Sequence, residues 1–366
     1  MLENKPIFRP SFGNRPDQLI GRDNIIEQIL EGLQSYPGSA ERSNLIIGQR
    51  GMGKTALLLE ISDRSKDFDY IPVRVTCGET MLENMIEILQ KTGMEYIKEP
   101  KKSIKGFNAG VLGFSIGLTF TEEAQRSFGF RVKLELICEK LAKYGKKVLL
   151  LVDEVEPTVP QMRELATVYQ ELVGNEVDIA IIMAGLPSAV SGILNYKTLT
   201  FLNRAQRITL ELISISEVEA YYYSAFSRAS IEASADIVKA AAAFTQGFPY
   251  QIQLVGFFLS KYSVPGKPID KEVLQRVKKS VKDEIDNKVL QAMLNPLSDM
   301  DLYVLKAIAC YDEPIKVSDV EKNTGIAHGT IQTYRKRLMD AGILYSPRRG
   351  ELAFILPQLA EYLKDR

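Results

Sequence analysis

The sequence predicts an α/β fold with a parallel sheet, followed by a helical domain and a small C-terminal module. Short apolar runs bounded by turn residues alternate with helical patterns, which is typical of a buried parallel sheet covered on both faces. The runs fall at 45–47, 71–75, 148–152, 179–183 and 207–210. After about residue 213 the pattern is helical throughout, as far as about residue 287.

The chain has 366 residues, too many for one compact core, and three domains are expected. We place them at 1–212, 213–290 and 291–366. The first domain is expected to contain an early helix over 23–33. Residues 104–132 break its rhythm, because they alternate with period two and are rich in Gly and Phe. We interpret that stretch as an inserted β-hairpin.

Composition excludes several classes of protein. The 46 basic and 46 acidic residues balance, so any nucleic-acid contact must come from a local patch. No apolar run reaches the roughly 18 residues of a membrane span, and the N-terminus lacks a signal-peptide apolar region, so no membrane partner is expected. The three cysteines lack metal spacing and indicate reduced thiols in a cytoplasm. A single histidine argues against a His-based metal site.

A phosphate-binding loop is predicted between the first apolar run and the helix after it. Residues 48–55 read G-x-x-x-x-G-K-[ST]. The glycines let several backbone N–H groups face one phosphate, and the helix N-terminus faces the same anion. Lys54 suits the β- and γ-phosphates, and the Thr55 hydroxyl suits Mg²⁺. The expected ATP-binding residues here are Gly48, Gln49, Arg50, Gly51, Met52, Gly53, Lys54, Thr55 and Ala56.

Two carboxylates complete this candidate site. The buried run 147–152 ends in Asp153 and Glu154. Asp153 is expected to join Thr55 in the magnesium shell, and Glu154 to polarise a water for attack on the γ-phosphate. The alternative is that both acids merely favour the start of a helix. The expected activity is ATP hydrolysis, with Lys54 and Glu154 as catalytic residues.

The chain resembles the AAA+ and STAND-type ATPases of prokaryotes, close to the origin-recognition and archaeal-type ATPases. Residues 12–23, FGNRPDQLIGRD, are similar to the family's segment ahead of the first helix, which covers the adenine. The phosphate loop, the Asp-Glu strand and Gly247-Phe248-Pro249, similar to the family's G-x-P in the helical lid, carry the rest. The resemblance implies a central strand order of 5-1-4-3-2, a lid formed by 213–290, and Pro249 packed on the base.

Departures from the family pattern concern its sensor residues. The run at 179–183 leads into Ala184-Gly185-Leu186-Pro187-Ser188, so the first polar sensor is missing or displaced to Ser188. No arginine follows Pro249. Both departures favour a slow, STAND-like switch over fast turnover.

Two arginines are further candidates. Arg204 falls where the family places an arginine finger that reaches a neighbouring copy, which would make an oligomer of this chain functional. Arg207 competes with it for that role. Arg22 is a candidate for nucleotide contact. The alternative for Arg204 is a surface arginine, and the alternative for Arg22 is an ordinary charge at the N-terminus of a helix.

The C-terminal module resembles a winged helix-turn-helix. Helices are expected at 299–310, 317–324 and 330–341, followed by two strands around a basic turn within 343–355. Residues 297–366 hold ten basic and ten acidic residues, whereas 328–349 hold five basic and one acidic. His328 is interpreted as a helix-cap or patch residue, and Arg337 is expected to face outward. The candidate DNA-binding residues are Thr330, Gln332, Thr333, Arg335, Lys336, Arg348 and Arg349.

Two functions remain open at this point. In the first, ATP or ADP in the α/β domain controls binding of double-stranded DNA by the C-terminal module. In the second, the same ATPase signals through a protein partner that docks on this module, without nucleic acid. The neutral charge of the whole module favours the second, and the local basic excess favours the first. A metabolic kinase is disfavoured because no lid for a second substrate is recognisable.

Overall fold

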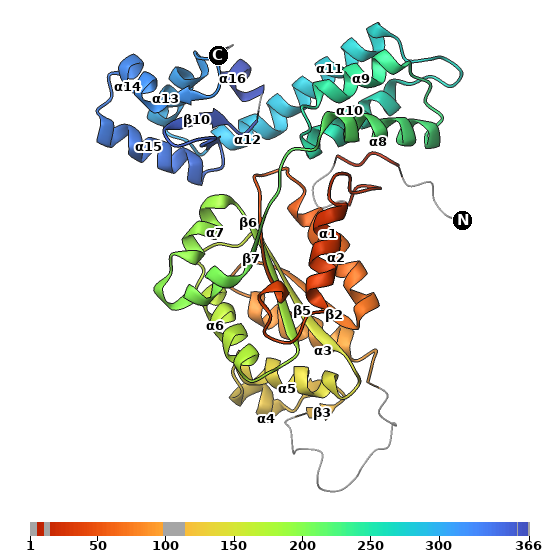
Figure 1. Ribbon diagram of the computed structural model, residues 1–366, viewed down its shortest axis with the longest axis vertical. Coiled ribbons are helices and arrows are strands. Elements are labelled where there is room, and N and C mark those ends of the chain that lie inside the picture. The colour runs from red at the N-terminus through yellow and green to blue at the C-terminus, as the bar shows by residue number, and fades with distance from the viewer. Residues whose placement is uncertain (1–5, 11–14, 98–113, 357, 365–366) are drawn as a thin grey trace, which may run out of the picture. The chain divides into compact units, whose positions relative to one another are not determined.

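The computed structural model describes residues 6–10, 15–97, 114–356 and 358–364 (Figure 1). Contacts between Cα atoms divide the chain into two compact units. One unit contains residues 22–48 and 54–210. The other contains residues 1–21, 49–53 and 211–366. Each unit is described by itself.

The α/β unit has a five-stranded sheet in the order β2-β5-β6-β1-β7, and every pair in it is parallel. When these five strands are renumbered 1 to 5 in chain order, the sheet read from β7 to β2 has the order 5-1-4-3-2. This order confirms the predicted fold. The five predicted apolar runs lie in these strands, except that Leu210 follows the end of β7. Their bounds are β1 Ser43–Ile47, β2 Tyr70–Thr76, β5 Lys147–Asp153, β6 Ile179–Gly185 and β7 Gln206–Thr209.

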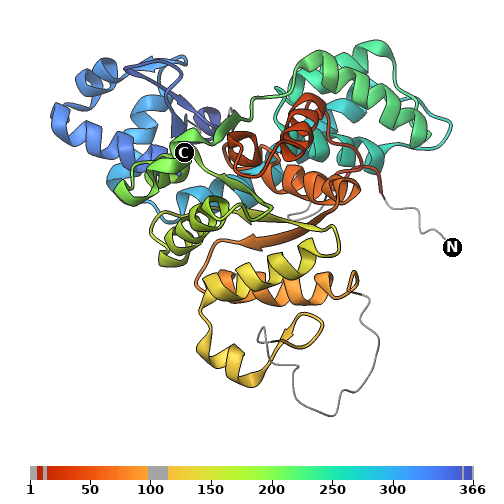
Figure 2. The same ribbon diagram turned by 60° about the horizontal axis from the view of Figure 1, so that its bottom comes forward.

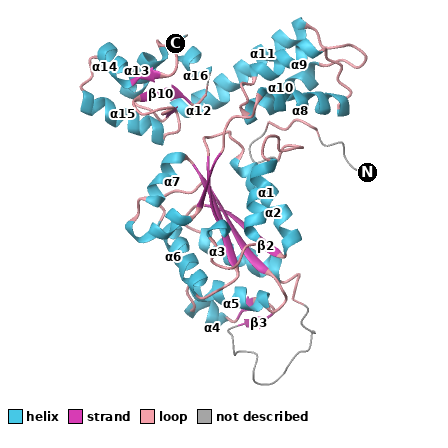
Figure 3. Cartoon of the chain, viewed as in Figure 1, coloured by secondary structure: helices cyan, strands magenta, loops and turns pink. Residues whose placement is uncertain are grey.

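Helices cover both faces of this sheet (Figures 1 and 3). One face packs against α3, α5, α6 and α7 in a continuous apolar core. Helices α1 and α2 pack on each other, and α2 contacts the central strands β5 and β6. The central strands β5 and β6 are buried on both sides, which explains why they read as unbroken apolar runs, whereas the edge strands β2 and β7 expose some residues. The helices are α1 Asp23–Leu33, α2 Lys54–Ser65, α3 Met81–Gly93, α5 Phe130–Ala142, α6 Pro160–Gly174 and α7 Pro187–Leu194, with short 3₁₀ turns η1 Ala40–Arg42, η2 Lys66–Phe68 and η3 Lys197–Arg204.

The hairpin predicted over 104–132 is smaller than expected. Residues 104–113 lie outside the described residues, and β3 Phe114–Ile116 pairs antiparallel with β4 Thr119–Phe120. From Thr121 onward the prediction is wrong, because α4 Glu122–Ser127 and then α5 follow. The Thr121 side chain accepts a hydrogen bond from the Ala124 N–H, and two glutamates occupy the first turn. This N-cap outweighs the alternating pattern.

In the second unit, the segment after residue 211 begins with four helices. They confirm the helical pattern predicted from about residue 213 to about residue 287. They are α8 Ile215–Arg228, α9 Ala235–Phe244, α10 Pro249–Tyr262 and α11 Lys271–Glu284. Phe8 is 2% exposed and packs edge-on against the rings of Tyr221 and Tyr222. A Cβ at Gly256 would lie 2.1 Å from the Phe8 ring, so the glycine makes room for that ring. The N-terminal segment is therefore anchored on these helices.

The C-terminal module combines helices with a three-stranded antiparallel sheet in the order β8-β10-β9. Strand β8, the two residues Ile315–Lys316, was not predicted, because so short a strand carries no alternation. A single π-helical turn, η4 Ile285–Leu290, leads from α11 into the module. The remaining elements are α12 Gln291–Leu294, α13 Asp299–Ala309, α14 Val317–Thr324, α15 His328–Asp340, β9 Leu344–Tyr345, β10 Glu351–Phe354 and α16 Gln358–Lys364.

A buried ion pair joins α13 to α15. Asp301 has a side chain 3% exposed, and it accepts from Arg337 Nε at 2.8 Å and from the same guanidinium's Nη2. Asp301 Oδ2 also accepts from the Ser298 hydroxyl at 2.6 Å, within a capping box at the start of α13. The expectation that Arg337 faces outward as a free charge is therefore wrong. The side chain crosses to α13 and its charge is neutralised there.

Opposing effects act on the pKa of Asp301. Burial raises it, whereas the hydrogen bond from Ser298 and the Arg337 guanidinium lower it, and the net shift is downward from 3.8. A carboxylate whose pKa is lower in the folded state stabilises that state above its unfolded pKa. This contribution is lost as the pH falls through and below 3.8.

We predict that Arg337→Ala lowers the free energy of unfolding by about 1–2 kcal/mol at pH 7. The buried Asp301 loses its counter-charge, although solvent around the half-exposed arginine moderates the loss. The pH dependence is read from Asp301→Asn. The difference in unfolding free energy between wild type and this variant should shrink as the pH falls below about 4. Chemical denaturation provides the measurement, with Arg348→Ala on an exposed turn as a control expected to change stability by less than about 0.5 kcal/mol. A difference constant down to pH 2 would contradict the assignment.

None of the helices in the described part of the chain has the length and apolar character needed to cross a bilayer.

Candidate nucleotide site

The predicted phosphate loop connects β1 to α2. Strand β1 ends at Ile47, α2 begins at Lys54, and the Gly48 N–H donates to the Gly185 carbonyl at 3.2 Å. Gly51 and Gly53 have φ angles of 79° and 85°, in the left-handed region that favours glycine. The motif glycines are therefore needed for the backbone path of this loop.

A hydrogen bond brings together the two residues predicted to hold magnesium. Thr55 Oγ1, in the first turn of α2, donates to Asp153 Oδ2, at the end of β5, at 2.6 Å. Asp153 is 4% exposed and also accepts from the Glu154 N–H at 3.0 Å. An alcohol and a carboxylate at one point form a hard-oxygen donor set. Mg²⁺ prefers such a set, and it commonly takes one or two protein carboxylates together with substrate phosphates.

Glu154 adopts an uncommon backbone conformation. Its φ angle is 54°, in the left-handed region, and its side chain is exposed. For a residue other than glycine this conformation costs on the order of 1–3 kcal/mol and is often found at functional sites. The conformation turns the chain away from the strand directly after Asp153. The two carboxylates therefore leave the sheet edge in different directions.

The Lys54 side chain turns back toward the first residue of the phosphate-loop motif. Its Nζ donates to the Gly48 carbonyl at 2.7 Å. This hydrogen bond holds the ammonium group close to the start of the phosphate loop. Arg50 and Gly51 are exposed, and Met52 is 6% exposed. The Lys54 ammonium, the Thr55 hydroxyl and the Asp153 carboxylate thus converge at the carboxyl edge of the sheet.

For the remaining nucleotide-binding candidates the structure gives the burial and the local position. Arg22 precedes α1 and is 6% exposed, which is more buried than expected of a surface charge. Arg204 is exposed at the end of η3, just before β7. Arg207 donates to Asn203 Oδ1 at 3.0 Å. Pro249 is the first residue of α10, where its missing N–H costs no hydrogen bond.

Phe248 is a residue that sequence reasoning missed. In the unit that contains 49–53 and 211–366, a Cβ placed on Gly51 would lie 2.6 Å from the Phe248 ring. The ring, 3% exposed, therefore packs directly on the phosphate loop. The Gly247 carbonyl accepts from the Ile213 N–H at 2.9 Å and fixes the turn before it. The Gly247-Phe248-Pro249 motif was the sequence signal for this contact, although the expected contact was that of the proline with the base.

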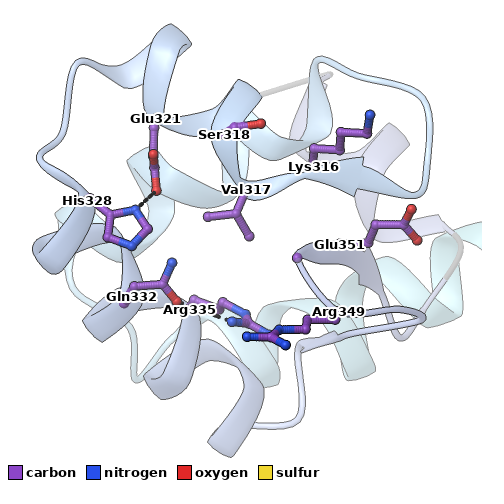
Figure 4. Close-up of a pocket in the computed structure, with 10 residues that line it drawn as sticks. Lys316, Val317, Ser318, Glu321, His328, Gln332, Arg335, Arg349 and Glu351 are labelled. Atoms are coloured by element: carbon purple, nitrogen blue, oxygen red, sulfur yellow. Dashed lines mark hydrogen bonds and ion pairs between the residues drawn. The ribbon is translucent and has the colours of Figure 1, made fainter.

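The DNA candidates of the C-terminal module fall into two groups. Thr330, Thr333 and Lys336 are exposed along α15. Arg335 is half-buried and donates to Gln332 Oε1 at 3.2 Å and to Ser346 Oγ at 3.4 Å (Figure 4). Arg335 is therefore tied to the turn between β9 and β10.

Two further side chains complete this surface. Arg348 and Arg349 are exposed on the turn between β9 and β10. His328 opens α15 but does not cap it, because its Nδ1 contacts Glu321 Oε1 at 2.6 Å across to α14. Of the two roles expected of His328, only membership of this surface remains.

Comparisons with known proteins agree with this geometry. Residues 38–193 match the family model described as AAA domain, and residues 287–363 match one described as Domain of unknown function (DUF8462). None of the curated proteins matches the chain.

Two solved structures are similar over the whole chain. The Walker-type ATPase PABY2304 of Pyrococcus abyssi is 15% identical, with 99% of each chain covered and a TM-score of 0.70. The ORC2 protein of Aeropyrum pernix, in ADPNP–ADP complexes, is 12% identical, with 97% of this chain and 96% of that chain covered and a TM-score of 0.63. At such identities the likeness shows the fold alone. The chain therefore has the fold of the P-loop ATPases, and its phosphate loop and Asp153 lie inside the segment that matches the AAA domain.

Proposed function

We propose that the chain is an ATP-binding and ATP-hydrolysing switch of the AAA+/STAND type, which couples its nucleotide state to DNA binding by a C-terminal winged helix. The proposal assigns 1–212 to the ATPase domain, 213–290 to the lid and 291–366 to the winged helix. The observation that carries the ATPase part is the hydrogen bond from Thr55 to Asp153 beside the phosphate loop.

Each residue of the site has a task that its geometry permits. The loop N–H groups and the Lys54 ammonium bind the β- and γ-phosphates. Thr55 and Asp153 would hold Mg²⁺, which neutralises phosphate charge when bound. The exposed Glu154 accepts a proton from the attacking water. Arg22 and Pro249 are proposed to contact the nucleotide beyond its phosphates.

Slow turnover is proposed from the lid. The Gln251 side chain, which occupies the position near which the family carries a sensor arginine, is 1% exposed and donates to the Phe244 carbonyl at 3.0 Å. An amide held in this way supplies no positive charge to a transition state. Catalysis then depends on Lys54, the magnesium pair and any arginine from another copy.

We predict that two substitutions separate binding from hydrolysis. Lys54→Ala removes the charge at the phosphates and should weaken ATP binding about 10- to 100-fold. Glu154→Gln should leave ATP bound but slow single-turnover hydrolysis by about 10²- to 10⁴-fold, because an amide accepts no proton. Nucleotide titration and single-turnover assays measure the two effects. Glu156→Gln, an exposed glutamate two residues away, is the matched control and should change neither. Wild-type hydrolysis in Glu154→Gln would show that another group activates the water.

Arg204 is proposed to act as a finger on a neighbouring copy, since it is exposed and lies next to the edge strand β7. We predict that ATPase activity per chain rises with protein concentration. Arg204→Ala and Lys54→Ala chains should each be inactive alone and should regain activity when mixed, because each supplies what the other lacks. Turnover independent of concentration would establish a monomeric switch. Arg207→Ala tests the competing arginine in the same assay.

The C-terminal module supports DNA binding through one face. Helix α15 follows α14 across a short turn, and β9 and β10 form a wing whose tip carries two exposed arginines. The exposed Thr330, Thr333 and Lys336 are proposed to contact phosphates, Gln332 a base edge, and Arg335 either a base edge or a phosphate. Such a local patch binds DNA even though the module as a whole is neutral.

A second function, docking of a protein partner, is favoured by a different observation. Met300, Tyr303 and Tyr345 are 44%, 48% and 41% exposed on the same module. Exposed aromatic side chains are enriched in protein interfaces. This alternative predicts that the basic residues contribute nothing to duplex affinity.

We predict salt-dependent binding of a random duplex, with an affinity that differs between the ATP and ADP states. Arg348→Ala combined with Arg349→Ala should weaken binding to all sequences. Each lost phosphate contact should flatten the plot of log affinity against log salt by about 0.9. Fluorescence anisotropy across a salt series is the measurement, and Tyr303→Ala serves as the control on the apolar surface. The DNA function would be excluded by a wild-type protein that shows no salt-dependent binding in either nucleotide state.

A further inference from the structure

A groove separates α14 and α15 from the wing of the C-terminal module (Figure 4). It has a volume of about 350 Å³. Gln332 and Arg335 line it from α15, Ser318 from α14, and Arg349 and Glu351 from the wing. Of the basic residues predicted to bind DNA, Arg335 and Arg349 lie in the groove, whereas Lys336 and Arg348 are not among its lining residues. The structure thus divides one basic patch into two pairs.

The guanidinium groups of Arg335 and Arg349 reach the groove from separate elements (Figure 4). Arg335 donates to Gln332 and to Ser346, whose hydroxyl lies 2.7 and 2.8 Å from the carbonyls of Arg348 and Glu351 and donates its one hydrogen to this pair. The Arg335 Nε atom is buried and has no hydrogen-bond partner among the described residues. The buried Nε does not reach the groove, but the Nη groups of its planar fork are suited to the oxygen atoms of a phosphate.

The opposite wall adds donors of a second kind. Helix α14 begins at Val317, and none of the described side chains caps its N-terminus. The Val317 N–H already donates to the Gly350 carbonyl at 2.9 Å, so the next N–H groups of the helix and its dipole remain to favour an anion. Ser318 lies in the same first turn and is one of the residues that line the groove. An anion between α14 and the arginines would be bound from two sides.

The charge of the lining selects among anions. The lining residues include three cationic side chains, Lys316, Arg335 and Arg349, and two carboxylates, Glu321 and Glu351, so the lining carries one net positive charge with His328 neutral. A phosphodiester carries a single negative charge and neutralises it. A phosphate monoester or inorganic phosphate carries about 1.5 to 2 negative charges at pH 7, so the carboxylates weaken its binding relative to a diester without preventing it.

We propose that this groove is a clamp for a single phosphate group, formed by Arg335, Arg349, Ser318 and the N-terminus of α14. The proposal rests on the proposed DNA function, in which the phosphate belongs to a duplex backbone. It adds that one phosphate is bound in a fixed position, and that Lys336 and Arg348 act only as diffuse charges. Ser318 and the α14 N-terminus join the interface, although the sequence analysis did not assign them to it.

The experiment compares adjacent arginines in the full-length protein. Duplex affinity is measured by fluorescence anisotropy for Arg349→Ala and for its neighbour Arg348→Ala, which removes the same charge from the same turn. Loss of a charge-assisted, bidentate contact should weaken binding about tenfold or more for Arg349→Ala. Arg348→Ala should weaken it less than about threefold, as expected of screened surface charge.

Two further variants distinguish loss of the phosphate contact from loss of folding. Arg335→Lys keeps the charge but removes the planar fork, and it should still weaken binding about tenfold. Ser318→Glu places a carboxylate in the groove at a helix N-terminus, where it stabilises the helix. It should therefore abolish duplex binding while leaving the thermal unfolding temperature unchanged or higher.

A second arm titrates the protein with inorganic phosphate against sodium chloride of equal ionic strength. Competition with the duplex by phosphate beyond that of chloride, lost in Arg349→Ala, supports the clamp. If wild type binds no duplex but binds inorganic phosphate in an Arg349-dependent manner, the clamp stands with a free phosphate as its ligand, and the DNA function fails. Equal losses in Arg348→Ala and Arg349→Ala overturn the clamp while leaving DNA binding intact. Absence of both duplex and phosphate binding overturns both proposals.

Discussion

The carboxyl edge of the parallel sheet is the constraint on which the nucleotide site depends. Strands β1 and β5 run in the same direction, each paired with β6, so the chain leaves both strands at one edge. Residues 98 positions apart in the sequence, Thr55 and Asp153, therefore come within 2.6 Å. The loop glycines and the left-handed Glu154 are local adjustments around that meeting point. A register shift of one residue in β5 would turn Asp153 to the other face of the sheet and separate the pair.

The sheet and the phosphate loop could be predicted from sequence because each has a strong local cause. Strands buried on both faces must be apolar throughout, and a loop with two left-handed residues must contain glycine there. The failures occur where distant residues decide. The 104–132 stretch alternates like a hairpin, yet the Thr121 cap converts its second half into helix. Arg337 reads as an outward-facing charge until folding places the buried Asp301 beside it.

Charge in the C-terminal module shows why counting residues is a poor guide to its surface. Its acids and bases are equal in number, but folding distributes them unequally. The charge of Arg337 is neutralised by Asp301, whereas Arg335 and Arg349 converge on the groove beside α14. A net charge near zero is therefore compatible with a specific anion site. It is incompatible with strong long-range attraction of a polyanion, so binding would rely on contact geometry.

Under the proposed function, a signal at the phosphates has to reach the C-terminal module through packed groups. The unit that holds 49–53 and 211–366 offers a contiguous set. Gly51 contacts the ring of Phe248 at the start of α10. Helix α10 is joined to α11 by the hydrogen bond between the Tyr262 and Ser280 hydroxyls at 2.9 Å, and α11 to α16 by the ion pair of Lys282 with Glu361 at 2.7 Å.

These contacts differ in how firmly they transmit a displacement. The Phe248 ring is buried and closely packed, so a movement of the phosphate loop must displace the ring or be resisted by it. The Lys282–Glu361 pair is exposed, contributes little energy, and is weakened by salt. The continuous backbone from α11 through the π-turn η4 into α12 is therefore the stronger link between lid and module. A π-turn is a common site of altered helix direction, and at this position it lies between the elements that would respond to nucleotide and those that would bind DNA.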